Sequence, residues 1–596
     1  MPLPTKSLLA RALGARALPA LLVSAACVVA SPAAAARSLS PRAPAPSQFE
    51  RADSLEGNFL AAYIAGAARD TAAAASYYRE TLKGDPRNPE VLERAFVAFL
   101  ADGAMADAFR LADRVVAKDQ VNGLAHLALG VKYLKAKQYA AARGHLAKGG
   151  RGRAADLTAT LITAWAYAGA GDGKKALETV DKLKGERAYA VFRDYHAGLI
   201  ADLVGNTAEA EKRLKTAYEA ERNTLRIVDA YARLQSRRGQ KDAALATYAA
   251  FEQVLPRHPI VKEAVEALKA GRTLPPLVAT AQEGAGEVLY GLGAAGNTQG
   301  DELPAIVYLR LALHLHPEHP LAIVTLADVF ERLKQLDRAN EIFARIPEGS
   351  PIRQTAEIQI GLNLEQMGKG DEAVALLEGL MKKRPDDVEV IMALGNVQRS
   401  RKKYAEAADI YSKAIERIGT PDRSHWSLFY YRGSAYERSK QWAKAEADLK
   451  KSLELVPDSL TNGKAQVLNY LAYSWVDQNL NIDEAFKMLK RAVEIAPRDG
   501  MIIDSLGWAH YRLGHYDEAV KELEKAIELK PGDPVINDHL GDAYWKVGRH
   551  LEARFQWQHA KDSSPEPEDL ANIVKKLEHG MDEAPKAESA LQKSGG

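Results

Sequence analysis

The sequence is poor in cysteine, in long apolar runs and in net charge. Its only cysteine among 596 residues is Cys27, so the body of the chain can form no disulfide and must be stabilised by side-chain packing. The 80 basic and 78 acidic side chains give a formal net charge of +2, which argues against general nucleic-acid or anionic-membrane binding. Beyond residue 36, no run of about 18 apolar residues predicts a membrane-spanning helix.

Residues 1–36 have the features of a secretory signal peptide. Lys6, Arg11 and Arg16 precede an apolar stretch, residues 18–30, which is followed by the small-residue cleavage site Ala34–Ala36. Removing these residues lowers the net charge from +2 to −1. We therefore expect a protein that is exported to the periplasm.

Cys27 offers an alternative to simple cleavage, namely lipidation and anchoring to the outer membrane. Lipoprotein signals carry a bulky aliphatic residue three positions before the lipidated cysteine, and here Ser24 stands in that place. The match is therefore imperfect, and we expect an unlipidated chain that begins near Arg37.

The body of the chain repeats with a period of 34 residues. The period is marked by a small residue, and the spacing departs from 34 only after Ala244, Ala407 and Ala445. Such a period with helical patterning inside it is typical of stacked helical repeats. The marker residues are Ala74, Ala108, Ala142, Ala176, Ala210, Ala244, Ala305, Ala339, Ala373, Ala407, Ala445, Ala485, Ala519 and Ala553.

The repeat is clearest between Met501 and Pro565. Leu506-Gly507, Ala519, Leu523, Ala526 and Pro531 recur 34 residues later as Leu540-Gly541, Ala553, Trp557, Ala560 and Pro565. The small residues suit two helices that approach closely, and the proline ends the second helix. This pattern resembles the tetratricopeptide repeat (TPR) family. The resemblance implies an all-α fold, a right-handed α-solenoid of about fourteen helix-turn-helix repeats.

The departures from the period suggest a domain organisation. The breaker Gly271–Pro276 separates an N-terminal array, residues 51–270, from a C-terminal array, residues 277–565. Residues 37–50 are expected to be a flexible leader and residues 566–579 a capping helix, because a terminal repeat must cover its apolar face. Residues 580–596 are expected to be disordered.

No motif predicts an active site, a cofactor or a metal. Gly291, Gly293 and Gly296 spell a dinucleotide-binding pattern, but they fall within the repeats, without the required strand and helix start, and we interpret them as a flexible turn. His314, His316 and His319 straddle the expected end of a helix, which disfavours a three-ligand metal site. We therefore predict a protein that is not an enzyme.

Aromatic residues concentrate in the last repeats, where the TPR resemblance implies a ligand-binding groove. In that family the second, fifth, ninth, twelfth and thirteenth positions of each first helix line a concave surface. Aromatic and charged side chains there suit a protein-binding hot spot; the alternative is that the rings pack between repeats. The groove residues implied are Asn469, Tyr473, Asp504, Trp508, Tyr511, Arg512, Asp538, Asp542, Trp545 and Lys546.

The last three repeats also show a narrower resemblance. The segments 469–475, 504–508 and 537–541 are similar to the final repeats of long exported TPR proteins of Gram-negative bacteria, which include an outer-membrane lipoprotein adaptor of a periplasmic carboxyl-terminal processing protease. The resemblance implies a protein-binding adaptor of such a protease. The alternative is a scaffold for envelope polysaccharide or outer-membrane assembly machinery.

Overall fold

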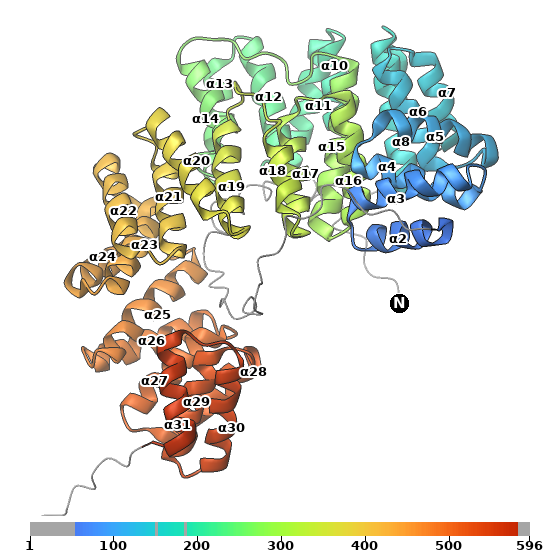
Figure 1. The fold of residues 1–596 in the computed structure, drawn as a ribbon. Coiled ribbons are helices and arrows are strands. Elements are labelled where there is room, and N and C mark those ends of the chain that lie inside the picture. The colour runs from blue at the N-terminus through green and yellow to red at the C-terminus, as the bar shows by residue number, and fades with distance from the viewer. Residues whose placement is uncertain (1–53, 150–152, 184–186, 582–596) are drawn as a thin grey trace, which may run out of the picture. The chain divides into compact units, whose positions relative to one another are not determined.

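The computed structural model describes residues 54–149, 153–183 and 187–581. The expected signal peptide and leader, Cys27 and nearly all of the expected tail lie outside these ranges. The described residues form 30 α-helices and one short 3-10 helix, η3 (Arg423–His425), in agreement with the predicted all-α fold (Figure 1). None of these helices is long and apolar enough to cross a membrane. The described residues divide into two compact units, 54–368 and 369–581.

Unit 1 contains the first eighteen described helices. The predicted breaker at residues 271–276 follows α14, and it therefore lies inside this unit. The helices are α2 (Leu55–Ala67), α3 (Thr71–Gly84), α4 (Pro89–Asp102), α5 (Met105–Lys118), α6 (Gly123–Lys135), α7 (Tyr139–Gly149), α8 (Arg153–Gly169), α9 (Gly173–Val180), α10 (Arg187–Leu203), α11 (Thr207–Ala220), α12 (Leu225–Arg237), α13 (Lys241–Glu252), α14 (Pro259–Lys269), α15 (Ala281–Gln299), α16 (Glu302–Leu315), α17 (Pro320–Arg332), α18 (Leu336–Phe343) and α19 (Arg353–Gln366).

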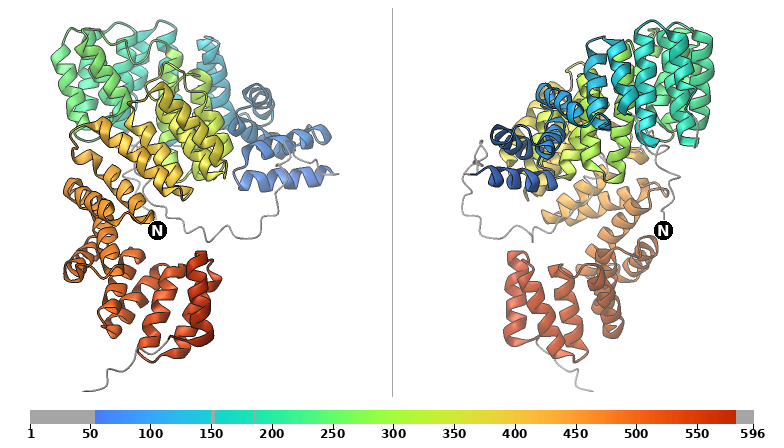
Figure 2. Two further views of the ribbon diagram at one scale, coloured as in Figure 1. Left: turned by 60° about the vertical axis from the view of Figure 1, so that its left-hand side comes forward. Right: turned by 90° about the vertical axis from the view of Figure 1, so that its right-hand side faces the viewer.

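Unit 2 contains the remaining twelve α-helices, which follow one another as short hairpins (Figure 2). They are α20 (Gly370–Lys383), α21 (Val388–Ser400), α22 (Tyr404–Ile418), α23 (Trp426–Arg438), α24 (Trp442–Leu455), α25 (Thr461–Asp477), α26 (Ile482–Ile495), α27 (Gly500–Arg512), α28 (Tyr516–Leu529), α29 (Pro534–Lys546), α30 (His550–Asp562) and α31 (Pro567–His579).

The alanine markers lie where the sequence pattern predicts. Thirteen of the fourteen are on the second helix of a helix pair within one unit, and Ala373 is on α20, the first helix of unit 2. Their exposed fraction is 0% in every case except Ala74, at 3%. A small side chain at this point lets the first helix of the pair approach closely. At Gly541 a Cβ atom would come within 2.5 Å of the Trp557 ring. The 34-residue spacing of the alanines therefore reflects the close packing of one helix of a pair on the other.

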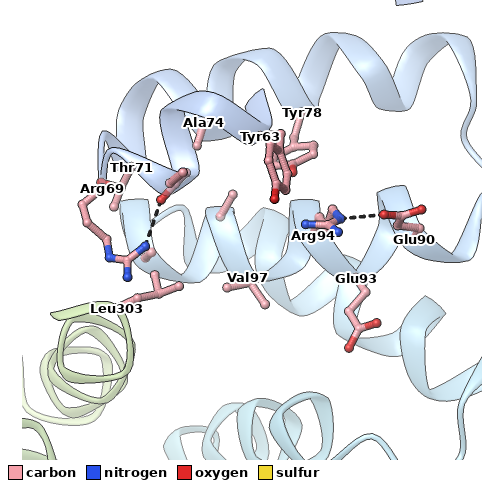
Figure 3. A pocket seen from close by; sticks show the side chains of 14 residues that line it. Tyr63, Arg69, Thr71, Ala74, Tyr78, Glu90, Glu93, Arg94, Val97 and Leu303 are labelled. Atoms are coloured by element: carbon pink, nitrogen blue, oxygen red, sulfur yellow. Dashed lines mark hydrogen bonds and ion pairs between the residues drawn. The ribbon is translucent and has the colours of Figure 1, made fainter. Parts of the chain in front are cut away.

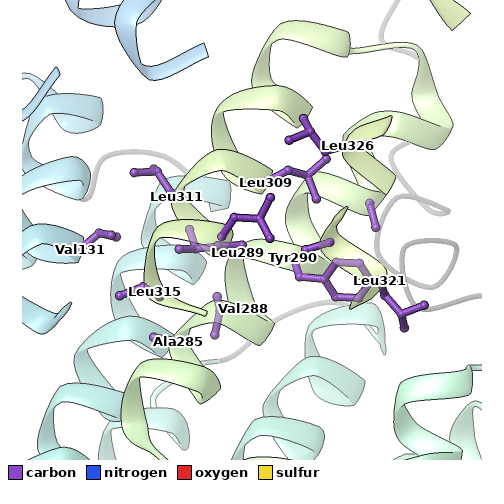
Figure 4. Packing of buried hydrophobic residues seen from close by; sticks show 14 of the residues in the cluster. Val131, Ala285, Val288, Leu289, Tyr290, Leu309, Leu311, Leu315, Leu321 and Leu326 are labelled. Carbon is purple, nitrogen blue, oxygen red and sulfur yellow. The ribbon is translucent and has the colours of Figure 1, made fainter. Parts of the chain in front are cut away.

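Unit 1 folds back on itself. α15 packs on α8 and α10, and α16 packs on α4 and α6, although these helices are far apart in the sequence (Figure 1). Val131 of α6 faces Leu311 and Leu315 of α16, and Leu289 of α15 is fully buried beside them (Figure 4). The α15–α16 pair is thus part of the apolar core of the first repeats.

The glycine-rich segment of α15 corrects the sequence interpretation. Gly291 and Gly293 lie inside a 19-residue helix, so the predicted flexible turn is wrong. A Cβ atom at Gly291 would come within 2.8 Å of the Phe192 ring, and one at Gly284 within 2.3 Å of Trp165. Glycine is needed here because α15 presses directly against aromatic side chains of α8 and α10.

A buried ion cluster accompanies this packing. Glu287 of α15 is 3% exposed. It accepts hydrogen bonds from Tyr195 of α10 at 3.2 Å and from Nε of Arg226 of α12 at 3.1 Å, and its other oxygen lies 2.9 Å from Nε2 of His319. Burial alone would raise the pKa of Glu287, but Arg226 and His319 hold that pKa well below its usual value.

Candidate protein-binding groove

Unit 2 contains a pocket of about 910 Å³ that opens between α25, α27 and the start of α29. Asn469 and Tyr473 line it from α25, and Asp504 lines it from α27. Three of the ten predicted groove residues therefore meet at one cavity. The full lining is Tyr430, Asn462, Gln466, Asn469, Tyr470, Tyr473, Ala496, Pro497, Arg498, Asp499, Gly500, Met501, Ile502, Asp504, Ser505, Leu529, Lys530, Asp533 and Val535.

One face of α25 supplies the polar wall of this pocket. Asn462, Gln466, Asn469 and Tyr473 are spaced by four, three and four residues, which puts them on the same side of a helix. α25 has 17 residues, so it continues about one turn beyond a first helix such as α27, with 13. Oδ1 of Asn469 is buried and has no hydrogen-bond partner. An unmet buried acceptor of this kind costs about 1–3 kcal/mol.

The predicted aromatic residues of α27 belong to a stack of rings, which an ion pair holds in place. Trp508 lies parallel to Tyr511, with ring centroids 4.7 Å apart, and parallel to His539 of α29, with centroids 4.0 Å apart. Nδ1 of His539 lies 3.0 Å from the buried carboxylate of Asp504. Nε1 of Trp508 is buried without a partner. Trp508 thus packs between repeats, as the alternative interpretation expects, and it remains half-buried; its part in binding a partner stays a prediction.

The predicted residues of the last repeat are covered by α31. Nζ of Lys576 on this helix lies 2.8 Å from Asp538 and 2.7 Å from Asp542. Asp542 also accepts a hydrogen bond from Nε1 of Trp557 at 2.9 Å. A Cβ atom at Gly580, directly after α31, would come within 2.3 Å of the Trp545 ring. Asp538, Asp542 and Trp545 therefore bind the chain's own capping helix.

The two remaining predicted residues lie outside the pocket. Nη1 of Arg512 donates to the backbone oxygen of Asp477 at the end of α25, at 3.2 Å, so it joins two repeats. Lys546 is half-buried at the end of α29. The sequence interpretation omitted Gln466, Met501 and Val535, which line the pocket. In the family register used for the other residues, each of the three stands at the second position of its repeat. The same register could therefore have found them.

We expect unit 2 to lose stability as the pH rises above about 6.5, the ordinary pKa of histidine. Burial alone would lower the pKa of His539, but Asp504, with Asp538 and Asp542, raises that pKa above its usual value. A histidine whose pKa is raised by folding contributes stability below its unfolded pKa of about 6.5, and this is lost as the pH passes the folded pKa. Hydrogen exchange of α27 and α29, followed as the pH rises and corrected for the intrinsic exchange rate, measures this loss.

His539→Gln provides the control, because glutamine keeps a donor toward Asp504 but does not titrate. The pH dependence of exchange in α27 and α29 should be smaller in this variant. An unchanged pH dependence would assign the titration to another group.

Unit 1 offers a less favourable cavity. A pocket of about 500 Å³ lies between α2, α3 and α4 and reaches Leu303 of α16 (Figure 3). Two of its cations have partners within the chain: Arg94 pairs with Glu90 at 2.9 Å, and Arg69 donates to the oxygen of Gly66 at 3.2 Å. None of the predicted groove residues lies here.

The groove register also explains why unit 1 offers so little space. Counting as for Gly507, with the eighth position twelve residues before each marker alanine, places Phe192, Tyr195 and Arg226 at groove positions of α10 and α12. These are the side chains that contact Gly291 and Glu287 of α15. The inner face of the first repeats is thus occupied by the chain's own α15.

Two sequence-family matches fall within the repeats. A family described as TPR repeat matches residues 507–548, and one described as tetratricopeptide repeat matches residues 358–423. These residues include α21 and most of α27 to α29, whose pairing and buried alanines are described above. Residues 358–423 and 507–548 therefore match tetratricopeptide repeat families.

Known TPR proteins resemble the chain only distantly. The TPR repeat-containing protein PA4667 of Pseudomonas aeruginosa is 26% identical over 189 residues, which are 31% of this chain and 30% of that protein. The match thus spans less than a third of this relative. A TPR protein from Parabacteroides merdae covers 43% of this chain and 97% of its own, with 17% identity and a TM-score of 0.36. Yeast Tom70 covers 88% and 95%, with 12% identity and a TM-score of 0.29.

Proposed function

We propose that this TPR protein is a non-catalytic scaffold whose protein partner docks in the groove of unit 2. The observation that carries the proposal is the contrast between the two inner faces. In unit 1 this face is filled by α15 and α16, whereas in unit 2 a pocket of about 910 Å³ stays open. Its mixture of tyrosine rings, aliphatic side chains and an unpartnered amide is typical of protein-binding surfaces.

A more specific proposal concerns the cellular compartment of the protein and the identity of its partner. The N-terminal features of the sequence support export to the periplasm, and the similarity of residues 469–475, 504–508 and 537–541 to adaptor repeats supports a protease partner. We propose that the chain acts as adaptor and activator of a carboxyl-terminal processing protease in the cell envelope. The chain would then hold the protease or its substrates without cleaving anything itself.

Removing the amide side chains of α25 tests the docking site. We expect the double variant Gln466→Ala/Asn469→Ala to bind its partner about tenfold more weakly, since each lost hydrogen bond costs about 0.5–1.5 kcal/mol. The full chain is immobilised, exposed to envelope extract, cross-linked, and its partners are quantified by mass spectrometry. Melting should be unchanged, because Gln466 and Asn469 are only half-buried.

Gln558→Ala is the matched control, since Gln558 is an exposed amide on α30 outside the pocket. The control should capture partners as the wild type does. Equal capture by the double variant and the control would place docking elsewhere in the chain.

A turnover assay tests the adaptor role. We expect the purified chain to cleave no envelope protein alone and to increase turnover by a purified carboxyl-terminal processing protease. The double variant should reduce this increase by the same factor as it reduces capture. Cross-linked partners that are all polysaccharide-export or outer-membrane assembly proteins, with no effect on turnover, would favour the alternative scaffold role.

A further inference from the structure

We propose that two copies of the chain associate through the outer face of α30, in an antiparallel two-fold contact centred on Phe555. The inference goes beyond the proposed function, because no residue of α30 lines the pocket of unit 2. Three observations lead to it: two exposed apolar side chains on α30, the burial of the corresponding pair on α16, and the charges that flank the exposed pair.

Leu551 and Phe555 form an apolar pair on the surface of α30. They are the most exposed large apolar side chains of the described residues, at 84% and 61%. Because they are four residues apart, they lie on one face of the helix. The preceding second helices carry charged residues at the same two positions, namely Asp517 and Lys521 in α28, and Asp483 and Lys487 in α26. The repeat pattern itself therefore does not require apolar side chains here.

A corresponding apolar pair on α16 shows how such a face is used in this chain. Leu551 and Phe555 stand two positions before and two positions after the marker alanine of α30. Among the other thirteen markers, only Ala305 of α16 has large apolar residues at both places, Leu303 and Val307.

The pair on α16 is buried against other helices. Val307 is 4% exposed, Leu303 lines a pocket together with Ala98 and Ala101 of α4, and α16 packs on α4 and α6. No helix among the described residues covers the pair on α30. We therefore infer that a second polypeptide supplies the helix that packs there.

The charges beside the pair favour a second copy of α30 as that helix. Glu552 and His559 are seven residues apart and lie on the same side of α30. When two copies of α30 cross antiparallel next to Phe555, Glu552 of each copy faces His559 of the other, twice by symmetry. The same crossing sets the two Phe555 rings against each other, an arrangement that aromatic pairs favour.

The size of this face predicts a weak dimer. A phenylalanine buries about 150–250 Å², and a stable interface buries about 800 Å² on each partner. The apolar pair therefore forms the centre of a small contact. We expect monomer and dimer to exchange with a dissociation constant on the order of 10 µM. Such a dimer would carry two pockets of unit 2, and an oligomeric partner could occupy both at once. This last consequence rests on the proposed function, but the dimer itself does not.

Sedimentation equilibrium of the full chain, well below and well above the expected dissociation constant, tests the contact. We expect the wild type to change from monomer to dimer. The variant Leu551→Asp/Phe555→Lys should weaken association at least tenfold. Its melting as a monomer should be unchanged, because both side chains are exposed and α28 carries the same two residues at these positions.

Leu60→Asp/Ile64→Lys is the matched control. It makes the same substitutions at the same spacing on α2, where Leu60 is 57% and Ile64 58% exposed. This variant should dimerise as the wild type does.

Cysteine cross-linking tests the two-fold arrangement. The chain that begins at Arg37 contains no cysteine, so a single one can be introduced on α30. In the proposed crossing the two copies of residue 555 face each other at disulfide distance, whereas those of residue 551 are about 13 Å apart along the helix axis. Mild oxidation should therefore link Phe555→Cys into a dimer and leave Leu551→Cys unlinked, although Leu551 is the more exposed of the two.

A wild-type chain that stays monomeric at every concentration would overturn the proposal. Association that the α30 double variant retains, that the α2 variant loses, or that continues beyond the dimer would overturn it as well. Cross-linking at residue 551 without cross-linking at residue 555 would reject the two-fold contact. None of these results depends on capture through Gln466 and Asn469, so the proposed function is tested separately.

Discussion

Glu287→Ala is expected to destabilise unit 1 by about 3–5 kcal/mol. The substitution leaves the largely buried Arg226 with only the more distant carboxylate of Asp229, at 3.7 Å, and removes the acceptor for Tyr195 and His319. A buried charge without a partner costs far more than an exposed ion pair contributes. Hydrogen exchange followed by mass spectrometry should show faster exchange in α10, α12 and α15.

The matched control is Glu318→Ala, which removes an exposed carboxylate next to His319 in the sequence and should change exchange very little. Exchange in unit 2 should stay the same in both variants. If Glu287→Ala and Glu318→Ala behave alike, the cluster around Glu287 contributes no stability, and the apolar contacts alone hold α15.

The second large effect concerns the capping helix. Lys576→Ala is expected to cost about 3 kcal/mol, because it leaves Asp542, which is 4% exposed, beside Asp538 without a cation. Burial and Asp538 both raise the pKa of Asp542, while Lys576 lowers it, so the variant should take up a proton in this region more readily than the wild type. Faster hydrogen exchange in α30 and α31 would measure this loss of stability.

Lys575→Ala is the control for this experiment, because Lys575 is exposed on the same helix and lies one position away. Lys576→Arg keeps a cation and should recover part of the stability. If removal of Lys576 also increases partner capture, α31 competes with the partner for the last repeat. Unchanged capture with faster exchange identifies α31 as a purely structural cap.

The sequence was a good guide to local structure. Each alanine marker records a close helix-to-helix approach inside a single pair, and both helices of a pair lie within about 34 residues. Ala445 and Ala485, which follow the two longer intervals in unit 2, are also 0% exposed, so the register of the repeat is kept across the extra residues. The extra residues there lie in the loops and in the longer α25.

Packing over long distances could not be read from the same pattern. From its sequence context Gly291 is predicted to be a turn residue. In the structure it packs against Phe192 of α10, about a hundred positions earlier. The same holds for the candidate site. Asp542 stands at a groove position, but Lys576 covers it, and no spacing within one repeat reveals that contact.

Because α15 and α16 pack back onto the first repeats, unit 1 cannot fold repeat by repeat as the chain is synthesised. In a linear array each repeat contacts only its neighbours, so folding can spread from one end. Here Lys135 bonds to the backbone of Leu315, 180 positions away, and Arg338 bonds to Thr71, 267 positions away. The early repeats cannot complete their core until residues near 338 have been synthesised. Unit 1 should therefore fold late and as one cooperative block, at the slower rate that distant contacts impose.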